Sequence, residues 1–364
     1  MRVGIITFHF VNNFGGMLQA YALRRTVEES CGIDTEIIDY RNWFIRLCDW
    51  IRLLPITTNP EEIRSGFETM GDRIARRRRF GLFTKDHNKL SRKYTNHWQL
   101  NLHPPGDDKY ICGSDQVWNP YLTMGVSYSY FLCFEHEPLN KIAYAPSFGT
   151  DGIGWLAEKR IGKNIRNFGF MSVRERSGQE LIKKIAGRDA ERLIDTTFLI
   201  EKAEWERLGR NPLVSDEPYI LLYIMQRDEE VYDYAKKIKE QKGLRIVEIS
   251  RYGYQPGFID EILVDVGPTE FLGLFRDAAF ICTNSYHGLA YSIIFEKEFF
   301  LMKCRRFSAR INNLLDMLKI DASLDNSDQA TLSADYDREY VRGTIAAERK
   351  KAVRYLRSSL GVTD

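Results

Sequence analysis

The stretch that decides the fold is Thr283-Asn284-Ser285-Tyr286-His287-Gly288, which is followed at once by the apolar run Leu289 to Phe295. An apolar segment, Ala278 to Cys282, leads into it and predicts a strand, while the run that follows predicts a helix. Small and polar groups therefore lie at a strand-to-helix turn, where backbone N–H groups can face an anion. His287 is the only histidine in the C-terminal half of the chain. His287 could take part in catalysis or pack in the core, and the rest of the sequence bears on this choice.

The same alternation of strand, loop and helix opens the chain. Arg2 to Phe8 predicts a buried strand, Met17 to Glu29 a helix, and Glu36 to Tyr40 a second strand. A unit of this kind begins a doubly wound parallel sheet, in which ligands bind at the carboxyl ends of the strands. After the proline-containing stretch 201–217 the alternation starts again at Tyr219, which indicates a second sheet.

From this pattern we predict an α/β fold of two Rossmann-like domains that face each other across a cleft. The first spans residues 1–205 and carries a helical insertion at about 43–105, where strand signals disappear. The second spans 206–335, and a helix at 336–364 is expected to pack back on the first domain. Residues 73–93 hold nine Lys or Arg against one Asp, which indicates either a solvated helix or a surface for an acidic carrier or a membrane.

Composition excludes several classes of protein. The chain has 364 residues, of which 44% are hydrophobic and 28% charged, so it is an ordinary globular protein. A net charge of +2 gives no reason to expect a nucleic-acid binder. The six cysteines show no metal-ligand spacing and are expected to be free thiols in a reducing compartment. Without a leader or a long apolar run, the expected location is the cytoplasm.

Polar loops that could bind a ligand follow several of the predicted strands. Before the first helix, Asn13, Gly15 and Gly16 could bind an anion through backbone N–H groups, and Gln19 could point at the same place; a tight turn is the alternative. After a strand at 109–112 comes a turn that combines amide, hydroxyl and carboxylate groups with an indole. These groups suit a sugar, although a structural turn with its tryptophan in the core is also compatible. The turn holds Gly113, Ser114, Asp115, Gln116, Trp118 and Asn119.

Other strand ends supply cations and a hydroxyl. Arg174 follows the predicted strand Gly169 to Val173, and its guanidinium could bind a carboxylate or phosphate, or form an ion pair between domains. Arg305, beside Arg306, is a second candidate for an anion, and Ser147 is a candidate for the wall of the site. Because the sequence has no triad spacing, zinc motif or Walker loop, we predict no metal and no cofactor.

Several of these stretches together resemble the polysaccharide pyruvyl transferase family. They occur in order over most of the chain, whereas residues 45–105 and the C-terminal tail carry little of the resemblance. Two positions depart from the common pattern: Thr196 stands where proline is frequent, and Gly16 where alanine is frequent. The matching stretches are GIITFHFVNNFGGMLQAYAL, IIDYRN, ICGSDQVWNP, KIAYAPSFG, SVRERSGQELI, LIDTTFLI with Trp205 after it, and TNSYHGLAYSIIF.

The resemblance implies a fold similar to that of GT-B glycosyltransferases. It also implies transfer of a pyruvyl group from phosphoenolpyruvate to two hydroxyls of one sugar, with formation of a cyclic ketal and release of phosphate. The histidine of the family's S-x-H-G pattern corresponds to Ser285 and His287, so His287 becomes the expected acid or base. Asp115 could be the base for an acceptor hydroxyl, and Asn284 is expected in the binding turn.

Two other functions remain compatible with the residues. One is a glycosyltransferase that uses a nucleotide sugar, which the fold alone permits. The other is a glycan-binding protein without catalysis, in which His287 is a packing residue. The expected partners are phosphoenolpyruvate and a sugar acceptor that is free, nucleotide-linked or lipid-linked, with contact to a membrane-bound carrier as a further possibility.

Overall fold

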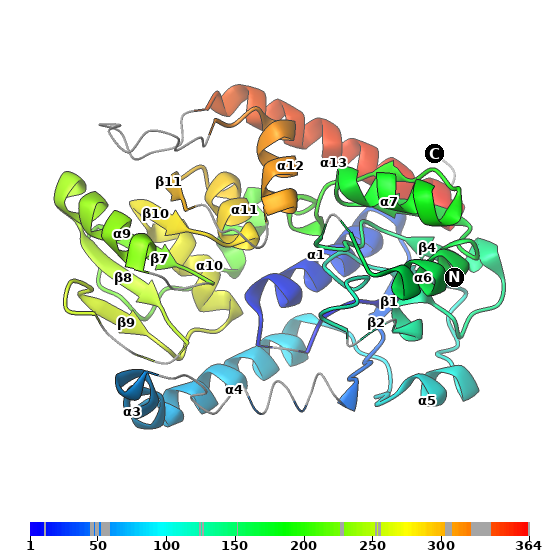
Figure 1. The fold of residues 1–364 in the computed structure, drawn as a ribbon, viewed down its shortest axis with the longest axis horizontal. Coiled ribbons are helices and arrows are strands. Elements are labelled where there is room, and N and C mark those ends of the chain that lie inside the picture. The colour runs from blue at the N-terminus through cyan, green and yellow to red at the C-terminus, as the bar shows by residue number, and fades with distance from the viewer. Residues whose placement is uncertain are drawn as a thin grey trace. The chain divides into compact units, whose positions relative to one another are not determined.

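The computed structural model describes residues 1–10, 12–43, 47, 51, 59–123, 125, 127–150, 152–225, 229–251, 253, 256–302, 308–321 and 336–362. They form two compact units, each built on its own sheet with helices around it (Figure 1). Unit 1 comprises Met1–Asp49, Thr84–Ile200 and Gly343–Asp364, and unit 2 comprises Trp50–Phe83 and Glu201–Arg342.

Unit 1 contains a parallel sheet of six strands in the order β2-β1-β3-β4-β5-β6. Strand β1 pairs with both of its neighbours, and its Ile5 lies opposite Ile37 of β2 and Ile111 of β3. All three isoleucines are completely buried, as expected for a parallel sheet covered on both faces. The strands are β1 Arg2–Ile6, β2 Asp34–Ile37, β3 Lys109–Cys112, β4 Lys141–Ala143, β5 Phe170–Val173 and β6 Glu191–Arg192.

Helices connect the strands of unit 1. The longest helix that lies wholly in this unit, α1, ends because Gly32 adopts a left-handed conformation with φ of 68° and donates its N–H to the carbonyl of Glu28 at 3.1 Å. The helices that lie wholly in this unit are α1 Phe14–Cys31, α5 His97–Leu102, α6 Trp155–Ile165 and α7 Arg176–Ala186, with the 3-10 helices η1 Tyr128–Phe131, η2 Pro138–Asn140 and η3 Thr196–Phe198.

Unit 2 contains a parallel sheet of five strands in the order β11-β10-β7-β8-β9. Its core is formed by apolar side chains of β7 and β10, such as Leu222 and Phe280, packed against Ile238 of α9. The strands are β7 Tyr219–Tyr223, β8 Arg245–Ile249, β9 Glu261–Leu263, β10 Phe280–Thr283 and β11 Glu298–Leu301. The helices are α3 Pro60–Glu68, α8 Lys202–Leu208, α9 Glu229–Lys242, α10 Pro268–Asp277, α11 Tyr286–Ile294 and α12 Ser308–Leu318.

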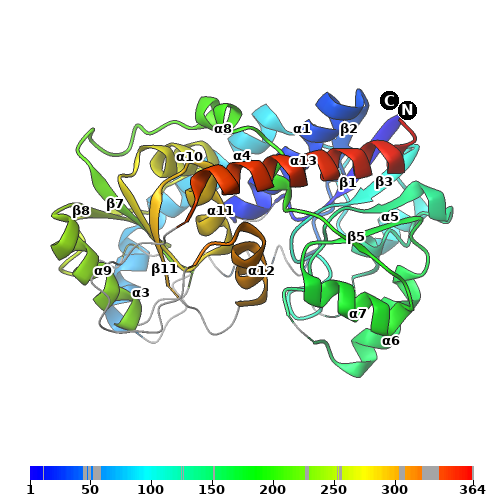
Figure 2. The same ribbon diagram turned by 90° about the horizontal axis from the view of Figure 1, so that it is seen from above.

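Two helices contribute residues to both units, namely α4 Met70–His87 and α13 Arg338–Leu360. Helix α13 is uninterrupted along its length, as Figure 2 shows in red. From residue 343 onward it belongs to unit 1, where Tyr355 donates its hydroxyl to the carbonyl of Ala143 at 2.9 Å and Leu356 is fully buried. None of the described helices is both long enough and apolar enough to cross a membrane.

The prediction of an α/β fold with two Rossmann-like parallel sheets is confirmed. We predicted the helical insertion at about 43–105 as part of the first domain, whereas α3, and α4 as far as Phe83, belong to unit 2. The chain divides between Ile200 and Glu201, whereas we placed the boundary at 205. The predicted C-terminal helix begins in unit 2, and its larger part belongs to unit 1.

The basic run of α4 is not uniformly solvated. Arg73 is buried and donates to the carbonyl of Gly66 at 3.2 Å, and Arg79 pairs with Asp265 at 2.6 Å and with Glu270 at 3.0 Å. Residues three apart lie on one face of a helix, so one arginine face of α4 packs against other elements of unit 2. Arg78, on another face, is exposed.

Four free cysteines lie among the described residues. Cys112 ends β3 and Cys282 lies in β10, and both side chains are completely buried. Burial raises the pKa of both thiols well above the ordinary value.

Candidate functional site

The turn between β10 and α11 is fixed by its own polar side chains. Thr283 donates its hydroxyl to the carbonyl of Tyr223 at 2.6 Å and accepts the N–H of Ser285 at 3.1 Å. Asn284 accepts the N–H of Met225 through its side-chain oxygen at 2.7 Å. These bonds tie the carboxyl end of β10 to that of its neighbour β7, so the predicted strand-to-helix turn is a rigid part of unit 2.

Gly288 allows α11 to begin close to β10. A Cβ at this position would lie 2.1 Å from the hydroxyl oxygen of Thr283, so any larger residue would displace the hydroxyl that holds the turn. The side chain before it, His287, is the second residue of α11 and is only 7% exposed. Its ring packs edge to face with that of Tyr286 at a centroid distance of 5.2 Å. His287 is therefore held at the N-terminal end of a helix, where backbone N–H groups favour an anion.

Two arginines of unit 2 lie near the carboxyl ends of its strands. The guanidinium of Arg310 on α12 lies 5.4 Å from the ring centre of Tyr286, and that of Arg76 on α4 donates to the carbonyl of Ser250 at 3.1 Å. Burial raises the pKa of Tyr223 to about 12, although Arg76 and a hydrogen bond with Ser285 act in the opposite direction. Arg76 thus lies at the carboxyl end of the sheet of unit 2. The sequence did not predict this position, because Ser250, to which Arg76 donates, is distant from it in sequence.

In unit 1, a buried ion-pair network joins the ends of β5 and β6. The guanidinium of Arg174 is bonded to the carboxylate of Asp195, and Asp115 and Glu175 lie within 3.8 and 4.0 Å of it. The side chain of Arg174 is 3% exposed. Asp195 also accepts the hydroxyl of Ser114 at 3.2 Å. Arg174 is therefore positioned by carboxylates of its own unit.

Asp195 forms a second part of the network. It is the N-cap of η3 and accepts both the N–H and the hydroxyl of Thr197 at 2.9 Å. Thr196, which stands where proline is frequent in the family, donates its hydroxyl to the carbonyl of Gln19 at 2.9 Å. The turn after Asp195 therefore forms without proline.

Glu175 holds the loop that follows β4. One of its carboxylate oxygens accepts the hydroxyl of Ser147 at 2.9 Å and the N–H of Phe148 at 3.0 Å. Gly149 has a φ of 65°, and a Cβ there would overlap the side-chain oxygen of Gln116, which also accepts an N–H of Asn119 at 2.8 Å. Ser147 and Gln116 are both buried and serve to shape the loops around Asp115.

Asp115 connects these loops to the start of α1. The carboxylate of Asp115 accepts the backbone N–H of the next residue, Gln116, at 2.8 Å. The φ of Asp115 is 80°, which is unusual for a residue with a side chain. A Cβ on Gly16 would lie 3.5 Å from the other carboxylate oxygen. Asn13 caps α1 by accepting the N–H of Gly16 at 3.2 Å, and its side chain is exposed. The structure therefore brings the predicted residues Asn13, Gly16, Asp115 and Arg174 together.

Gln19 does not point away from its helix into open space. It is completely buried, and its amide nitrogen donates to the hydroxyl of Thr7 at 2.9 Å and to the carbonyl of Gly16 at 3.0 Å. Gly113 is likewise enclosed, because a Cβ there would meet Leu23 at 3.0 Å. Gln19 and Gly113 are thus enclosed by residues of unit 1 and support the loops. This differs from the expectation that they contact substrate.

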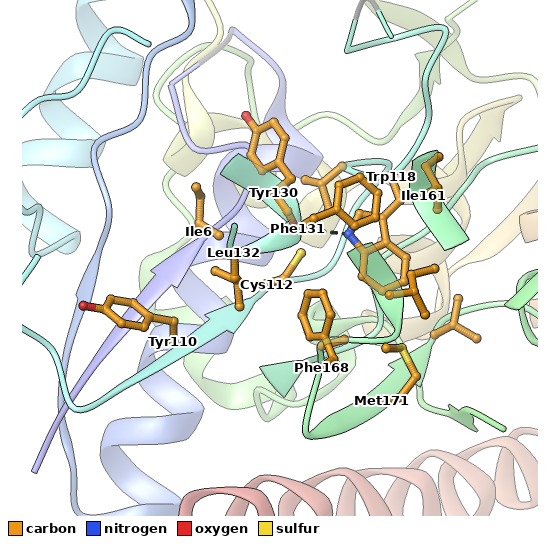
Figure 3. Packing of buried hydrophobic residues seen from close by; sticks show 14 of the residues in the cluster. Ile6, Tyr110, Cys112, Trp118, Tyr130, Phe131, Leu132, Ile161, Phe168 and Met171 are labelled. Carbon is orange, nitrogen blue, oxygen red and sulfur yellow. Dashed lines mark hydrogen bonds between the residues drawn. The ribbon is translucent and has the colours of Figure 1, made fainter. Parts of the chain in front are cut away.

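The prediction that Trp118 stacks on a sugar is wrong. Its side chain is 1% exposed and lies inside the core of unit 1, stacked on Phe131 at a centroid distance of 5.2 Å (Figure 3). Its indole N–H donates to the carbonyl of Tyr130 at 3.1 Å. The segment 127–134 returns over the turn and covers the indole, and this covering segment is what sequence reasoning did not anticipate.

A further buried pair was missed at the end of β1. His9 is completely buried, with one ring nitrogen 3.1 Å from the carbonyl of Thr7 and the other 3.0 Å from the carboxylate of Asp39. Burial acts to raise the pKa of Asp39, but hydrogen bonds from His9 and Arg41 outweigh it and hold the pKa below the ordinary value. A histidine directly after the first strand was the available signal.

Two predictions concern cations and metals. Arg305 and Arg306 lie outside the described residues. Within the described part of the chain, no group of three or more His, Cys, Asp or Glu side chains could hold a metal ion.

Solved structures of very different sequence have a similar fold. S. aureus MnaA, in its co-structure with UDP, is 8% identical with a TM-score of 0.51, and the alignment covers 100% of this chain and 97% of that one. UDP-GlcNAc 2-epimerase from Neisseria meningitidis bound to UDP-GlcNAc is 8% identical with a TM-score of 0.47, covering 98% and 100%. E. coli heptosyltransferase WaaC with ADP is 12% identical with a TM-score of 0.40, covering 86% and 90%. The two parallel sheets and the likeness to S. aureus MnaA confirm the predicted GT-B-like α/β fold.

Comparison of sequences identifies the family. Among curated proteins, no sequence matches this chain. The sequence model of the family described as polysaccharide pyruvyl transferase matches residues 13–304, from the N-cap of α1 to beyond β11. Since this match covers far more than half of the sequence, the protein belongs to the polysaccharide pyruvyl transferase family.

Proposed function

We propose that the protein transfers a pyruvyl group from phosphoenolpyruvate to two hydroxyls of a sugar in a polysaccharide or glycan precursor. The observation that supports this most is the family match over residues 13–304, which contains the turn with His287. Because phosphoenolpyruvate is a metabolite of the cytoplasm, that is where we propose the reaction takes place.

The reaction sets the requirements for the residues. The methylene carbon of phosphoenolpyruvate gains a proton and becomes a methyl group, while the adjacent carbon forms one bond to each of two sugar oxygens. The bond between that carbon and the phosphate oxygen breaks, so inorganic phosphate leaves. Of the two protons that the hydroxyls release, one balances the new methyl group and the other leaves with phosphate. An acid for the methylene carbon and a base for the hydroxyls are therefore needed.

We assign the acid or base in unit 2 to His287. An imidazole can both give and take a proton near neutral pH, and its place at the start of α11 is suited to an anionic donor. Asn284 and Ser285 shape the turn around it, and backbone N–H groups of this turn are proposed to bind the donor.

In unit 1, we assign the positive charge to Arg174 and a base to Asp115. Arg174 has five N–H donors in a fixed geometry that suits a carboxylate or a phosphate. Asp195 fixes the orientation of Arg174, and Asp115 lies next to Arg174 and close to the start of α1. There, the N-cap Asn13 and the glycines Gly15 and Gly16 are proposed to contact the ligand.

The test is an activity assay with phosphoenolpyruvate and a set of free, nucleotide-linked and lipid-linked sugars. We expect phosphate release together with a new ketal methyl signal in the NMR spectrum of the sugar. His287→Ala should lower kcat by about a hundredfold or more, as expected for loss of a general acid or base. The control is His103→Ala, which changes an exposed histidine of unit 1 and should leave kcat unchanged.

Other outcomes distinguish the alternatives. Consumption of a nucleotide sugar without phosphate release from phosphoenolpyruvate would show a glycosyltransferase. Full activity of a folded His287→Ala variant, with an unchanged thermal unfolding midpoint, would exclude the role that we assign to this histidine.

A further inference from the structure

The arginine run of helix α4 has no part in the chemistry proposed above, although two of its side chains are anchored in unit 2. Arg73 is 4% exposed and donates to a backbone carbonyl of α3, and Arg76 donates to the carbonyl of Ser250. The next residue of the same face, Arg79, is instead paired with two carboxylates. The bonds to carbonyls hold the guanidiniums of Arg73 and Arg76 in place without neutralising their charge.

Close packing fixes this face of α4 against two loops of unit 2. A Cβ on Gly253, in the loop after β8, would lie 2.5 Å from the methyl carbon of Thr69, which directly precedes α4. A Cβ on Gly267, directly before α10, would lie 2.6 Å from the Cβ of Arg79. Both loops approach α4 this closely because these two residues have no side chain. The arginine face is therefore built into unit 2.

Three arginines of unit 2 lie close enough to act on one another. The pKa of Arg76 is lowered to about 10, chiefly by burial, and the positive charges of Arg251 and Arg73 add to the lowering. Tyr223 and Asp265 act in the opposite direction, but this aspartate also pairs with the next arginine of the α4 face. Bringing like charges together away from water costs free energy, and a bound anion offsets that cost. We call Arg73, Arg76 and Arg251 the arginine cluster of unit 2.

The arginine cluster lies where a parallel α/β sheet binds its ligands, at the carboxyl ends of the strands. Tyr223 is the last residue of β7, and Ser250 and Arg251 directly follow β8. The side chain of Tyr223 is also hydrogen-bonded with that of Ser285, two residues before His287. The cluster is therefore at the same edge of the sheet as the turn that holds His287.

We propose that the arginine cluster of unit 2 binds the diphosphate of an acceptor sugar that is carried on a nucleotide or on a lipid. A guanidinium forms paired hydrogen bonds with phosphate oxygens, and two linked phosphates can contact more than one guanidinium at once. The donor has a single phosphate and a carboxylate, for which we assign the turn before α11 and Arg174. The identification of the ligand as the acceptor rests on the proposed pyruvyl transfer, whereas the binding of a diphosphate does not.

Isothermal titration calorimetry of the full chain, without phosphoenolpyruvate, tests the proposal. The probes are UDP, farnesyl diphosphate and inorganic phosphate. We expect at least one of the diphosphates to bind more tightly than inorganic phosphate, and the tighter of the two identifies the carrier as a nucleotide or a lipid. Arg76→Gln should raise the Kd of that diphosphate at least about tenfold, because a charge-assisted hydrogen bond is lost.

Two further variants make the result specific. Arg251→Gln changes the exposed member of the cluster and should also raise the Kd, so the test does not depend on the folding of Arg76→Gln. Arg78→Gln is the matched control, since Arg78 is exposed on another face of α4, and it should bind like the wild type. The proposal is overturned if the wild type binds neither diphosphate, or if a folded Arg76→Gln or Arg251→Gln variant binds as tightly as the wild type.

Titration with phosphoenolpyruvate separates this proposal from the proposed function. Phosphoenolpyruvate should not displace the diphosphate, and displacement that is lost in Arg76→Gln would mean that the cluster binds the donor, which overturns the proposal. Diphosphate binding that depends on Arg76, in a protein that releases no phosphate from phosphoenolpyruvate, would support the site and contradict only pyruvyl transfer. Phosphate release with free sugars, by a protein that binds no diphosphate, would contradict only the site.

Discussion

A single side chain, Trp118, shows how far one residue's surroundings determine its role. The polar turn that contains it suggested sugar binding, but the indole is stacked on Phe131 and close to Phe148 and Phe168 in the core of unit 1. The residues that cover it are up to fifty positions later in the chain. Local sequence therefore predicted the turn correctly and the direction of its tryptophan wrongly.

Replacement of Trp118 should destabilise unit 1. We expect Trp118→Ala to lower the free energy of unfolding by about 3–5 kcal/mol, because a large cavity remains in a packed core. Trp118→Phe keeps most of the apolar contact and loses the hydrogen bond to Tyr130, so its effect should be less than half as large. Urea unfolding followed by circular dichroism measures both. An unchanged urea midpoint for Trp118→Ala would contradict the burial of this side chain.

Elements whose determinants are near in sequence were predicted well. The turn at 283–288 was correctly predicted between a strand and a helix, because the apolar runs of β10 and α11 on either side of it are local signals. Helix α4 was predicted as a helix but with the wrong surroundings, because Arg79 pairs with Asp265, far away in sequence. Periodicity identifies a helix, but it does not identify the partner of an arginine face.

The turn between α11 and β11 gives a prediction about pH. The pKa of Glu296 is lowered to about 2, chiefly by a hydrogen bond from Arg342 of α13, while burial acts in the opposite direction and Lys202 of α8 adds to the lowering. Because the pKa in the folded state lies below the unfolded value of about 4.3, this ion-pair contribution is complete above that pH. It should be lost as the pH falls towards 2.

Urea unfolding at several pH values measures this contribution. Glu296→Gln should be less stable than the wild type at pH 6, and the difference should shrink steadily between about pH 4.3 and 2. Glu298→Gln is a suitable control, because its partner Lys242 lies in a different helix, α9. A difference between Glu296→Gln and wild type that is the same at pH 6 and pH 2.5 would contradict the assignment.

For the whole molecule, the chain order of the two units has a consequence for stability. Unit 1 consists of three separate segments, and the last of them is the greater part of α13. Ala352, Leu356 and Leu360 are buried at 2% exposure or less, and Lys351 donates to the carbonyl of Arg192 at 2.6 Å. The first and last parts of the sequence therefore share one core.

Removal of residues 343–364 should thus destabilise the unit at the other end of the chain. We expect the truncated protein to lose at least about 5 kcal/mol of folding free energy, because several fully buried side chains are deleted and their cavity is exposed. Thermal unfolding and binding of a hydrophobic dye measure the effect. A thermal midpoint equal to that of the full chain would show that α13 contributes nothing to unit 1.

Two of the buried cysteines, one in each sheet, allow the units to be followed separately by chemistry. Cys112 belongs to the sheet of unit 1 and Cys282 to that of unit 2, and a thiol reacts with alkylating reagents only as the exposed thiolate. In the native protein each can be alkylated only after its own sheet opens. Mass spectrometry of the two peptides during a labelling time course would therefore report two opening rates from one sample, without an introduced probe.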